Sequence, residues 1–375
     1  MNFYDVAIIG GGLAGLTSGI HLSRLGFRVV IIEKHEFPRH KVCGEYISNE
    51  VLPYLKWLDL DIEALKPSHI STLRFTTANG RMYESQLPGG GFGISRFAFD
   101  HFLFENAAQS GCDFVFASVT DVSFLNDIFT VTTNDGHHIT AKIALGAFGK
   151  RSNLDKLLQR QFALKKSNWL AIKAHYDVDF PDDVVGLYNF AGGYCGVSQV
   201  EDGKVNICYL TDYKSFAGFK DATAFQSSIL SQNPELAKIF SSARMIFEKP
   251  MTISQISFDS KPQVENHILM IGDSAGLIHP LCGNGMAMAI LAAKMASEAA
   301  TEFLLSRMSR LECEASYSRK WKKQFSSRMR TGRILAFAMR NRSLTDTFLK
   351  VLKVFPSLLP AIIAQTHGKP IVVSS

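Results

Sequence analysis

The sequence lacks paired cysteines, long uncharged apolar runs and low-complexity tracts. Its six cysteines are scattered over 375 residues without a C-x-x-C pair, which argues against both a disulfide framework and a metal site of the zinc type. No run of roughly 18 uncharged apolar residues is present, so no segment is expected to span a membrane. The opening residues enter a strand pattern without the basic and apolar regions of a signal peptide, which predicts a cytoplasmic protein.

Charge is also scarce, and it is unevenly distributed. Charged residues make up 20% of the chain, and the net charge is +6. Residues 301–350 hold twelve Lys and Arg against four Asp and Glu, so the basic excess belongs to the C-terminal region. This region is expected either to touch an anionic membrane surface peripherally or to cap the protein with solvated charges. No nucleic-acid-binding motif accompanies the charge, so no nucleic-acid partner is expected.

A glycine-rich turn between two buried strands opens the chain. Residues 5–10 and 28–33 read as parallel strands, and residues 13–25 read as the helix between them. The turn GGGLAG fits G-x-G-x-x-G in this confirming context, and Glu33 follows Gly10 by 23 residues. The acid can accept from ribose hydroxyls, and its charge disfavours a 2′-phosphate. The unit predicts a Rossmann-like dinucleotide site that includes Gly10, Gly12, Ala14, Gly15, Glu33 and Lys34.

A second strand–glycine–helix pattern occupies residues 267–290. It places Gly272 and Asp273 at the end of a strand, and residues 283–285 before a long helix of small residues. An acid at a strand end can hold a polyol hydroxyl, and the helix N-terminus can stabilise negative charge on a reduced flavin ring. A simple NAD dehydrogenase does not need this distant second site. The expected cofactor is therefore FAD.

Strand patterns separate these two nucleotide-like units, so two interleaved domains are expected rather than two consecutive ones. The expected fold is α/β: a Rossmann-like FAD-binding domain, an α+β substrate domain built on a sheet, and a helical C-terminal region. Their predicted ranges are 1–68, 95–165 and 259–300 for the first, 69–94 and 166–258 for the second, and 301–375 for the third. A hairpin turn is expected at residues 134–136, Asn-Asp-Gly.

Four motifs in this order resemble those of p-hydroxybenzoate-hydroxylase-type flavoproteins: GGGLAG, RFAFD at 96–100, GAFGKRS at 146–152 and GDSAGLIHPLCGNG at 272–285. The segment PRHKVCGEYIS at 38–48 resembles the geranylgeranyl reductase branch. The resemblance covers about residues 3–300. It implies that the cofactor also meets Lys41, Cys43, Gly44, Arg96, Gly272, Asp273, Pro280, Gly283, Asn284, Gly285 and Met286.

Two positions depart from these family patterns. Phe148 stands where the flavoproteins often carry an aspartate in G-A-D-G-x-x-S. Isoprenoid reductases tend to carry Y-x-W-x-F-P along the substrate cavity, and residues 193–203 keep Tyr194 but place Gly196 at the tryptophan position. A substrate cavity that is wider or differently shaped is expected, with Tyr194 and Gly196 in its wall. The W-x-W-x-I-P signature of flavin halogenases is absent.

Three residues near the expected flavin carry groups that could take part in chemistry. Cys43 is a catalytic thiol, a covalent anchor of the flavin, or a small side chain in a loop that cradles the flavin. Glu45 is either a proton donor or a hydrogen-bonding partner within that loop. His279 is either a proton relay or a satisfied histidine.

The predicted function is that of an FAD-dependent oxidoreductase acting on a small lipophilic substrate, unsaturated or aromatic. Reduction of a C=C bond, as in geranylgeranyl-reductase-like enzymes, is the first interpretation. A monooxygenase using NAD(P)H and O₂ is the second, and a flavin-binding module without turnover is the third. Because no second G-x-G-x-x-G is present, NAD(P)H or an electron carrier is expected to act as external reductant.

Overall fold

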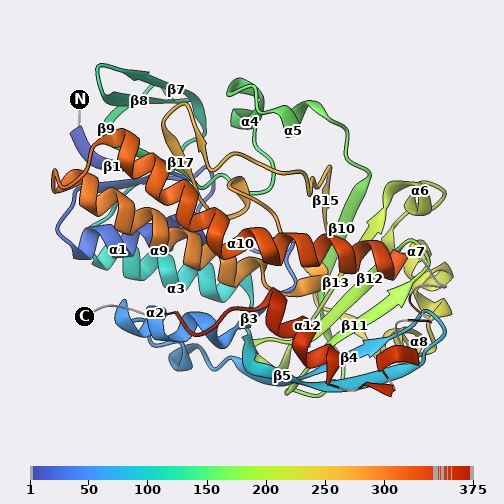
Figure 1. Ribbon diagram of the computed structural model, residues 1–375. Helices are drawn as coiled ribbons and strands as arrows, with labels where there is room; N and C mark the ends of the chain where they lie inside the picture. The colour runs from blue at the N-terminus through green and yellow to red at the C-terminus, as the bar shows by residue number, and fades with distance from the viewer. Residues whose placement is uncertain are drawn as a thin grey trace.

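Two sheets organise the protein, and the opening unit lies at the centre of the first one (Figure 1). The computed structural model describes residues 3–340, 345, 347, 350–352, 354, 355 and 357–371. The other positions of the range 301–375 lie outside the described residues. Strand β1 (Phe3–Ile9) pairs in parallel with β2 (Val29–Ile32) and with β9 (His138–Gly146), as expected for a buried strand of continuous apolar residues.

The first sheet has the order β16-β17-β9-β1-β2-β6, and β8 attaches a hairpin to β9. β8 and β9 run antiparallel on either side of residues 134–136, which confirms the hairpin predicted there. The remaining strands of this sheet are β6 (Asp113–Val115), β7 (Val119–Leu125), β8 (Ile128–Thr133), β16 (Val264–Glu265) and β17 (Ile268–Met270).

Three helices cover one face of the first sheet: α1 (Leu13–Arg24), α3 (Arg96–Gln109) and α9 (Gly285–Leu304) (Figure 1). They bury the main apolar core against β1, β2 and β9. Alanines fill much of the inner side of α9, so that this helix packs closely on α1. A smaller core on the opposite face holds residues of β1, β8 and β9 with Leu154 of α4 (Asn153–Leu157), which α5 (Gln161–Leu164) follows.

The second sheet is mainly antiparallel and has the order β14-β10-β13-β12-β11-β4-β5-β3, with β15 paired to β10. Strand β3 (Tyr46–Ser48) belongs to it through β5, although residues 1–68 were assigned to the nucleotide domain. Its other strands are β4 (Ser68–Thr76), β5 (Met82–Gly93), β10 (Trp169–Asp177), β11 (Val184–Phe190), β12 (Gly193–Gln199), β13 (Val205–Asp212), β14 (Arg244–Met245) and β15 (Met251–Ser254).

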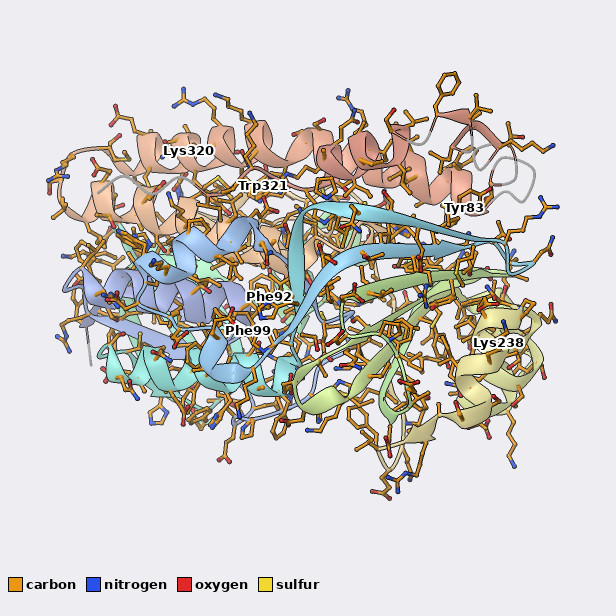
Figure 2. The ribbon with its side chains drawn as sticks, turned by 90° about the horizontal axis from the view of Figure 1, so that it is seen from below. Tyr83, Phe92, Phe99, Lys238, Lys320 and Trp321 are labelled. Atoms are coloured by element: carbon orange, nitrogen blue, oxygen red, sulfur yellow. The ribbon has the colours of Figure 1, made fainter. Side chains whose placement is uncertain are left out.

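Short helices with an aromatic core cover one face of the second sheet. They are α6 (Tyr213–Phe216), α7 (Ala222–Ser228) and α8 (Pro234–Ser242), and Phe225 is wholly buried among their side chains. Where the two sheets join, Phe92 of β5 meets Phe99 of α3 edge to face, with ring centroids 6.4 Å apart (Figure 2). The chain therefore crosses between the sheets through a packed junction rather than a free linker.

Helix α10 (Arg310–Arg340) runs along the molecule from the helices of the first sheet to the second sheet (Figures 1 and 2). Below it, α2 (Leu52–Trp57) follows a short turn that contains Glu50. The Glu50 carboxylate accepts from both terminal nitrogens of Arg328, at 3.1 and 3.2 Å, and both residues are buried. The Glu50 carbonyl also accepts from the Ile371 N–H, at 2.9 Å, beyond α12 (Leu358–Thr366). This ion pair ties the C-terminal region to the body of the protein.

We predict that Arg328→Met lowers the free energy of unfolding by about 3–5 kcal/mol, because it leaves the Glu50 carboxylate buried without its partner. Urea denaturation followed by circular dichroism measures the change. As a control, Lys238→Met breaks an exposed pair with Glu235 on α8 and is expected to change stability by less than about 1 kcal/mol. Equal effects of the two substitutions would contradict the anchoring role of Arg328.

Candidate functional site

A cavity of about 920 Å³ opens between the two sheets, where the predicted motifs meet. This volume suits a large organic ligand. Most of the residues predicted to bind the cofactor line it, and so do two of the three candidate catalytic residues, Cys43 and Glu45. The cofactor-site residues in the lining are Gly10, Gly12, Ala14, Glu33, Lys34, Lys41, Cys43, Gly44, Arg96, Gly272, Asp273, Pro280, Gly283, Gly285 and Met286.

Five predicted residues lie behind the lining instead: Gly15, Asn284, His279, Tyr194 and Gly196. Gly15 packs directly on the turn, since a Cβ there would stand 2.0 Å from the Gly10 carbonyl oxygen. Asn284 precedes α9, and its side-chain amide donates to the Thr366 carbonyl at 2.7 Å. Both residues thus support the cavity wall without facing the cavity.

His279 and Tyr194 lie together in an apolar cluster one layer behind the cavity. Their ring centroids are 5.9 Å apart, and Trp169 lies at the same distance from His279. The Nδ1 atom of His279 accepts from the Leu281 N–H at 3.4 Å, so this ring atom caps a short turn. Gly196 lies two residues after Tyr194 on β12. His279 is therefore not itself among the residues that line the cavity, and its predicted relay role stays a prediction.

The glycine turn leaves open space at Gly12. The nearest heavy atom to a Cβ built there would be Nη2 of Arg96, 3.9 Å away. Helix α1 starts at this turn without a side-chain cap, so its first N–H groups remain available to an anion. At the end of β2, Glu33 is buried and accepts from the Gly11 N–H at 2.8 Å and from Arg39 at 3.1 Å.

Two cations and one acid stand behind the open space at Gly12. Arg96 reaches the wholly buried Asp100 through Nε and Nη2, at 2.7 and 2.8 Å, and Lys41 reaches it at 2.7 Å. Burial alone would raise the pKa of Asp100, but Arg96 and Lys41 outweigh it and hold the pKa below its ordinary value. Two cations with one anion leave a net positive charge beside the helix N-terminus. This charge suits a pyrophosphate.

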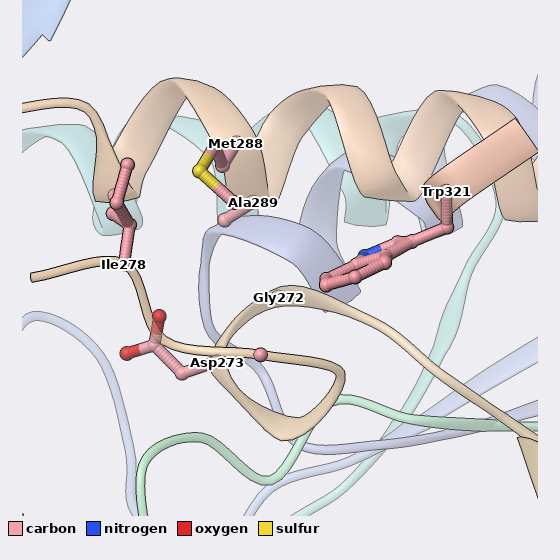
Figure 3. Close-up of a pocket in the computed structure, with 8 residues that line it drawn as sticks. Gly272, Asp273, Ile278, Met288, Ala289 and Trp321 are labelled. Carbon is pink, nitrogen blue, oxygen red and sulfur yellow. The ribbon is translucent and has the colours of Figure 1, made fainter. Parts of the chain in front are cut away.

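The Gly272–Asp273 turn is fixed from behind by buried cations. Lys261 donates to the Asp273 carbonyl at 2.7 Å, and Arg160 donates to the Ser274 carbonyl at 2.8 Å. Figure 3 shows the turn under Met288 and Ala289 of α9, with Trp321 of α10 beside it. The hollow among these side chains leaves no room for a water molecule. The backbone of the turn that carries Asp273 to the main cavity is therefore held by these hydrogen bonds and by close packing.

Side chains of the second sheet hold the Lys41–Glu45 loop through its carbonyls. Asn206 of β13 donates to the carbonyls of Cys43 and Gly44, at 3.2 and 2.9 Å. Lys173 of β10 donates to the Lys41 carbonyl at 3.2 Å. The thiol of Cys43 points to the sulfur of Met286 at the start of α9, 3.3 Å away. The loop thus forms a fixed rim between the sheet and the second glycine turn.

Glu45 ends this loop as a wholly buried carboxylate in a left-handed backbone conformation, with φ of 56°. Its oxygens accept from Lys173, from Nε2 of His175 at 2.6 Å and from the Arg96 N–H at 2.7 Å. Burial alone would raise the pKa of Glu45, but Lys173 and His175 outweigh it and hold the pKa below its ordinary value. Glu45 is therefore an ionised hydrogen-bond acceptor at neutral pH.

Lys173, His175 and Asn206 are the functional residues that sequence reasoning missed. Lys173 and His175 stand two residues apart in an otherwise apolar strand, so they share one face of β10, and His175 pairs with Asn206 across the sheet. Polar residues at i and i+2 inside WLAIKAHYD were the available signal. Their partner could not be read from the sequence because Glu45 lies more than a hundred residues away.

The residues of the cavity fit the FAD expected from the sequence. The uncapped start of α1 and the two cations suit the pyrophosphate, and Glu33 lies where a ribose would be held. At the other end, α9 also starts without a side-chain cap, and a Cβ at Gly44 would meet no atom within 4 Å. A flat ring therefore has space between the Lys41–Glu45 loop and the second glycine turn.

We predict that Gly12→Val yields a folded protein that binds FAD at least about tenfold more weakly, because the new side chain fills the space left for the pyrophosphate. Gly15→Ala is the matched comparison. Its methyl group would overlap the Gly10 carbonyl, so we expect it to lower the stability of the apoprotein by about 1–3 kcal/mol. Flavin absorbance after dialysis measures FAD binding, and urea denaturation measures stability, so the two effects can be separated. Full FAD binding by Gly12→Val would contradict the assignment of the pyrophosphate site.

We predict that Glu45→Gln lowers the free energy of unfolding at neutral pH by about 3–5 kcal/mol, since Lys173 loses its anionic partner. A lowered folded-state pKa means that the charge of Glu45 stabilises the protein above its ordinary value of 4.5 and that this stabilisation is lost as pH falls further. The difference in the free energy of unfolding between wild type and variant should therefore become smaller below pH 4.5. The double variant Glu45→Gln/Lys173→Met should recover part of the loss, and a difference independent of pH would refute this assignment.

Comparison with known proteins agrees with the geometry of the site. A digeranylgeranylglycerophospholipid reductase of Methanosarcina acetivorans is 25% identical over 338 residues, which are 86% of this chain and 81% of the relative. A solved geranylgeranyl bacteriochlorophyll reductase-like protein of Thermoplasma acidophilum superposes with a TM-score of 0.79 at 20% identity, over 97% of each chain.

Halogenases share the same fold. The flavin-dependent halogenase CmlS superposes with a TM-score of 0.80 at 22% identity, over all of this chain and 74% of its own. The likeness to these solved structures confirms the expected α/β flavoprotein fold and does not choose between reactions. The FAD binding domain family matches residues 3–301, and the chain therefore belongs to that family.

Proposed function

We propose that the protein is an FAD-dependent reductase that adds two hydrogens across a C=C bond of a lipophilic, isoprenoid-like chain. The observation that carries this proposal is the lining of the cavity, which combines polar groups that fit FAD with an apolar wall formed by Val42, Ile253 and Leu277. The reductase named among the relatives supports the reaction class. Bound FAD would supply the hydride, and NAD(P)H or an electron carrier would replenish it.

The apolar wall belongs to the cluster that contains Tyr194. Val42, Ile253 and Leu277 of this cluster line the cavity. Leu210 and Leu281 stand behind them. Such a wall binds hydrocarbon by removing apolar surface from water, roughly 25 cal/mol per Å². Apolar contacts of this kind favour an aliphatic, unsaturated substrate.

Glu45 does not suit the role of proton donor in this reaction. Its carboxylate is ionised and already accepts from Lys173 and His175, so it carries no proton to give at neutral pH. Its effect is to fix the rim of the cavity. His40 lies on the same rim, with its ring 5.1 Å from that of His175. Burial, with Lys173 and His175 adding to it, lowers the pKa of His40 to about 4, so its imidazole is neutral.

Cys43 is the rim residue whose thiol can be tested most directly. The backbone of the rim is held by Asn206 and Lys173, so the shape of the loop does not depend on the thiol. The sulfur contact with Met286 gives the side chain a packing role beside the space for the ring. These contacts support Cys43 as part of the cradle rather than as the proton donor.

We predict that one anaerobic turnover of the reduced holoprotein with digeranylgeranylglycerophospholipid saturates one double bond and gives a product heavier by two hydrogens. Mass spectrometry of the extracted lipid checks this outcome. Cys43→Ala should retain FAD and lose less than about tenfold in rate, whereas the loss of a general acid costs about 10²- to 10⁴-fold.

Two results would reject the proposal in different ways. A product that gains one oxygen, formed only when O₂ is admitted, would assign the monooxygenase reaction instead. The other result is a protein that binds FAD but whose reduced flavin is reoxidised neither by the lipid nor by O₂ in the presence of an aromatic substrate. That result would favour a flavin-binding module without turnover. Gly12→Val serves as the negative control, because it removes the cofactor site while the apolar wall remains intact.

A further inference from the structure

The C-terminal region carries exposed apolar side chains at one end of the molecule. Ile334 and Phe337 lie one turn apart on α10 and are 62% and 71% exposed. Val354 and Phe355 follow α10 and are 70% and 61% exposed. Single exposed apolar side chains are normal on a protein surface, whereas a group of them in one region marks an interaction surface. We call these four residues the tail patch.

Contacts between described residues bring both halves of the tail patch to the same end. The Thr345 hydroxyl donates to the carbonyls of Ala338 and Met339, at 3.1 and 3.3 Å. Leu352 is buried with Met339 and with Tyr83 of β5. Figure 2 labels Tyr83 at the end of the molecule where the last helices lie over the second sheet. Leu352 therefore packs at the end of α10, and the exposed Val354 and Phe355 follow it within three residues of chain.

Exposed basic residues border the tail patch. Arg330 and Arg333 precede Ile334 and Phe337 at helical spacing, so all four share one face of α10. Lys350 is exposed shortly before Val354. This combination of apolar and basic side chains on one face is characteristic of helices that lie in a bilayer interface.

The inner face of α10 packs on the apolar wall of the cavity region. Leu335 and Met339 belong to the cluster around Tyr194 and Leu281. Leu335 and Met339 lie on the inner side of the helix, and Ile334 and Phe337 lie on the outer side of the same turns. One helix therefore separates the tail patch from the apolar cluster of the candidate site.

We propose that the tail patch docks on an anionic lipid bilayer, with its apolar side chains at the boundary of headgroups and acyl chains and the basic residues against the headgroups. A second copy of this chain fits less well, because a symmetric contact would oppose the arginines of both copies. No helix in the described part of the chain is long and apolar enough to cross a bilayer. The contact is therefore one with the membrane surface, and it does not depend on the reaction proposed above.

Flotation of the full, FAD-loaded chain with vesicles tests this proposal. We expect binding to vesicles of phosphatidylcholine mixed with phosphatidylglycerol, and weaker binding to phosphatidylcholine alone. Phe337→Ser/Phe355→Ser should lower partitioning about tenfold or more, because both side chains would leave the interface. The control Leu125→Ser/Leu164→Ser changes equally exposed apolar residues on β7 and α5 and should bind like wild type.

The basic border is tested separately. Arg330→Gln/Arg333→Gln should lower binding to the anionic vesicles about tenfold and reduce its dependence on salt, whereas Lys204→Gln/Lys238→Gln, with the same change of charge elsewhere, should not. Retained flavin absorbance verifies folding in each variant. Absence of wild-type flotation, or equal loss in both apolar pairs, would overturn the proposal. So would a dimer in sedimentation velocity that only Phe337→Ser/Phe355→Ser disperses, since it would assign the patch to a second copy.

Discussion

A carboxylate buried between the two sheets is the constraint on which the site depends. The chain leaves the first sheet after β2 and enters the second at β3, and Glu45 is the last residue before it does so. An unpaired carboxylate at this depth would cost several kcal/mol, so Lys173 and His175 have to meet it. These partners lie on β10, near the far edge of the second sheet from β3. The ion cluster thus fixes the position of the second sheet relative to the Lys41–Glu45 loop.

The same loop forms the rim of the cavity, so folding and the shape of the site have a common origin. Asn206 and Lys173 satisfy carbonyls that the loop cannot pair within itself. A rim held by side chains from another sheet keeps its position while the space inside the cavity is filled or emptied. This arrangement supplies preorganisation, because little conformational entropy remains to be lost when a cofactor binds.

Sequence patterns predicted the parts of the fold and site that are local in the chain. The turn at Gly10–Gly15, the acid at Glu33 and the second turn before α9 each depend on residues within one strand–turn–helix unit. The Glu45 cluster joins residues 45, 173 and 175. The spacing of apolar residues within a single helix or strand cannot predict a contact between residues so far apart in the chain. The interpretation of Glu45 as a partner within its own loop missed that its partners come from another sheet. The short strand β3 was not predicted for the same reason, since three residues carry too little pattern to show their pairing with β5.

Helix α10 contacts both the second glycine turn and the buried Glu50. Its inner side packs against the second glycine turn, where a Cβ at Gly332 would stand 3.0 Å from the Cys282 sulfur. Arg328, one turn earlier, holds the buried Glu50. Because both contacts are rigid, the orientation of the outer face of the helix is set by the same packing that sets the cavity wall. The inner apolar residues of α10, Leu335 and Met339, belong to the cluster behind the cavity. The outer face that we propose to meet a bilayer and the packing behind the apolar wall of the cavity therefore belong to one helix.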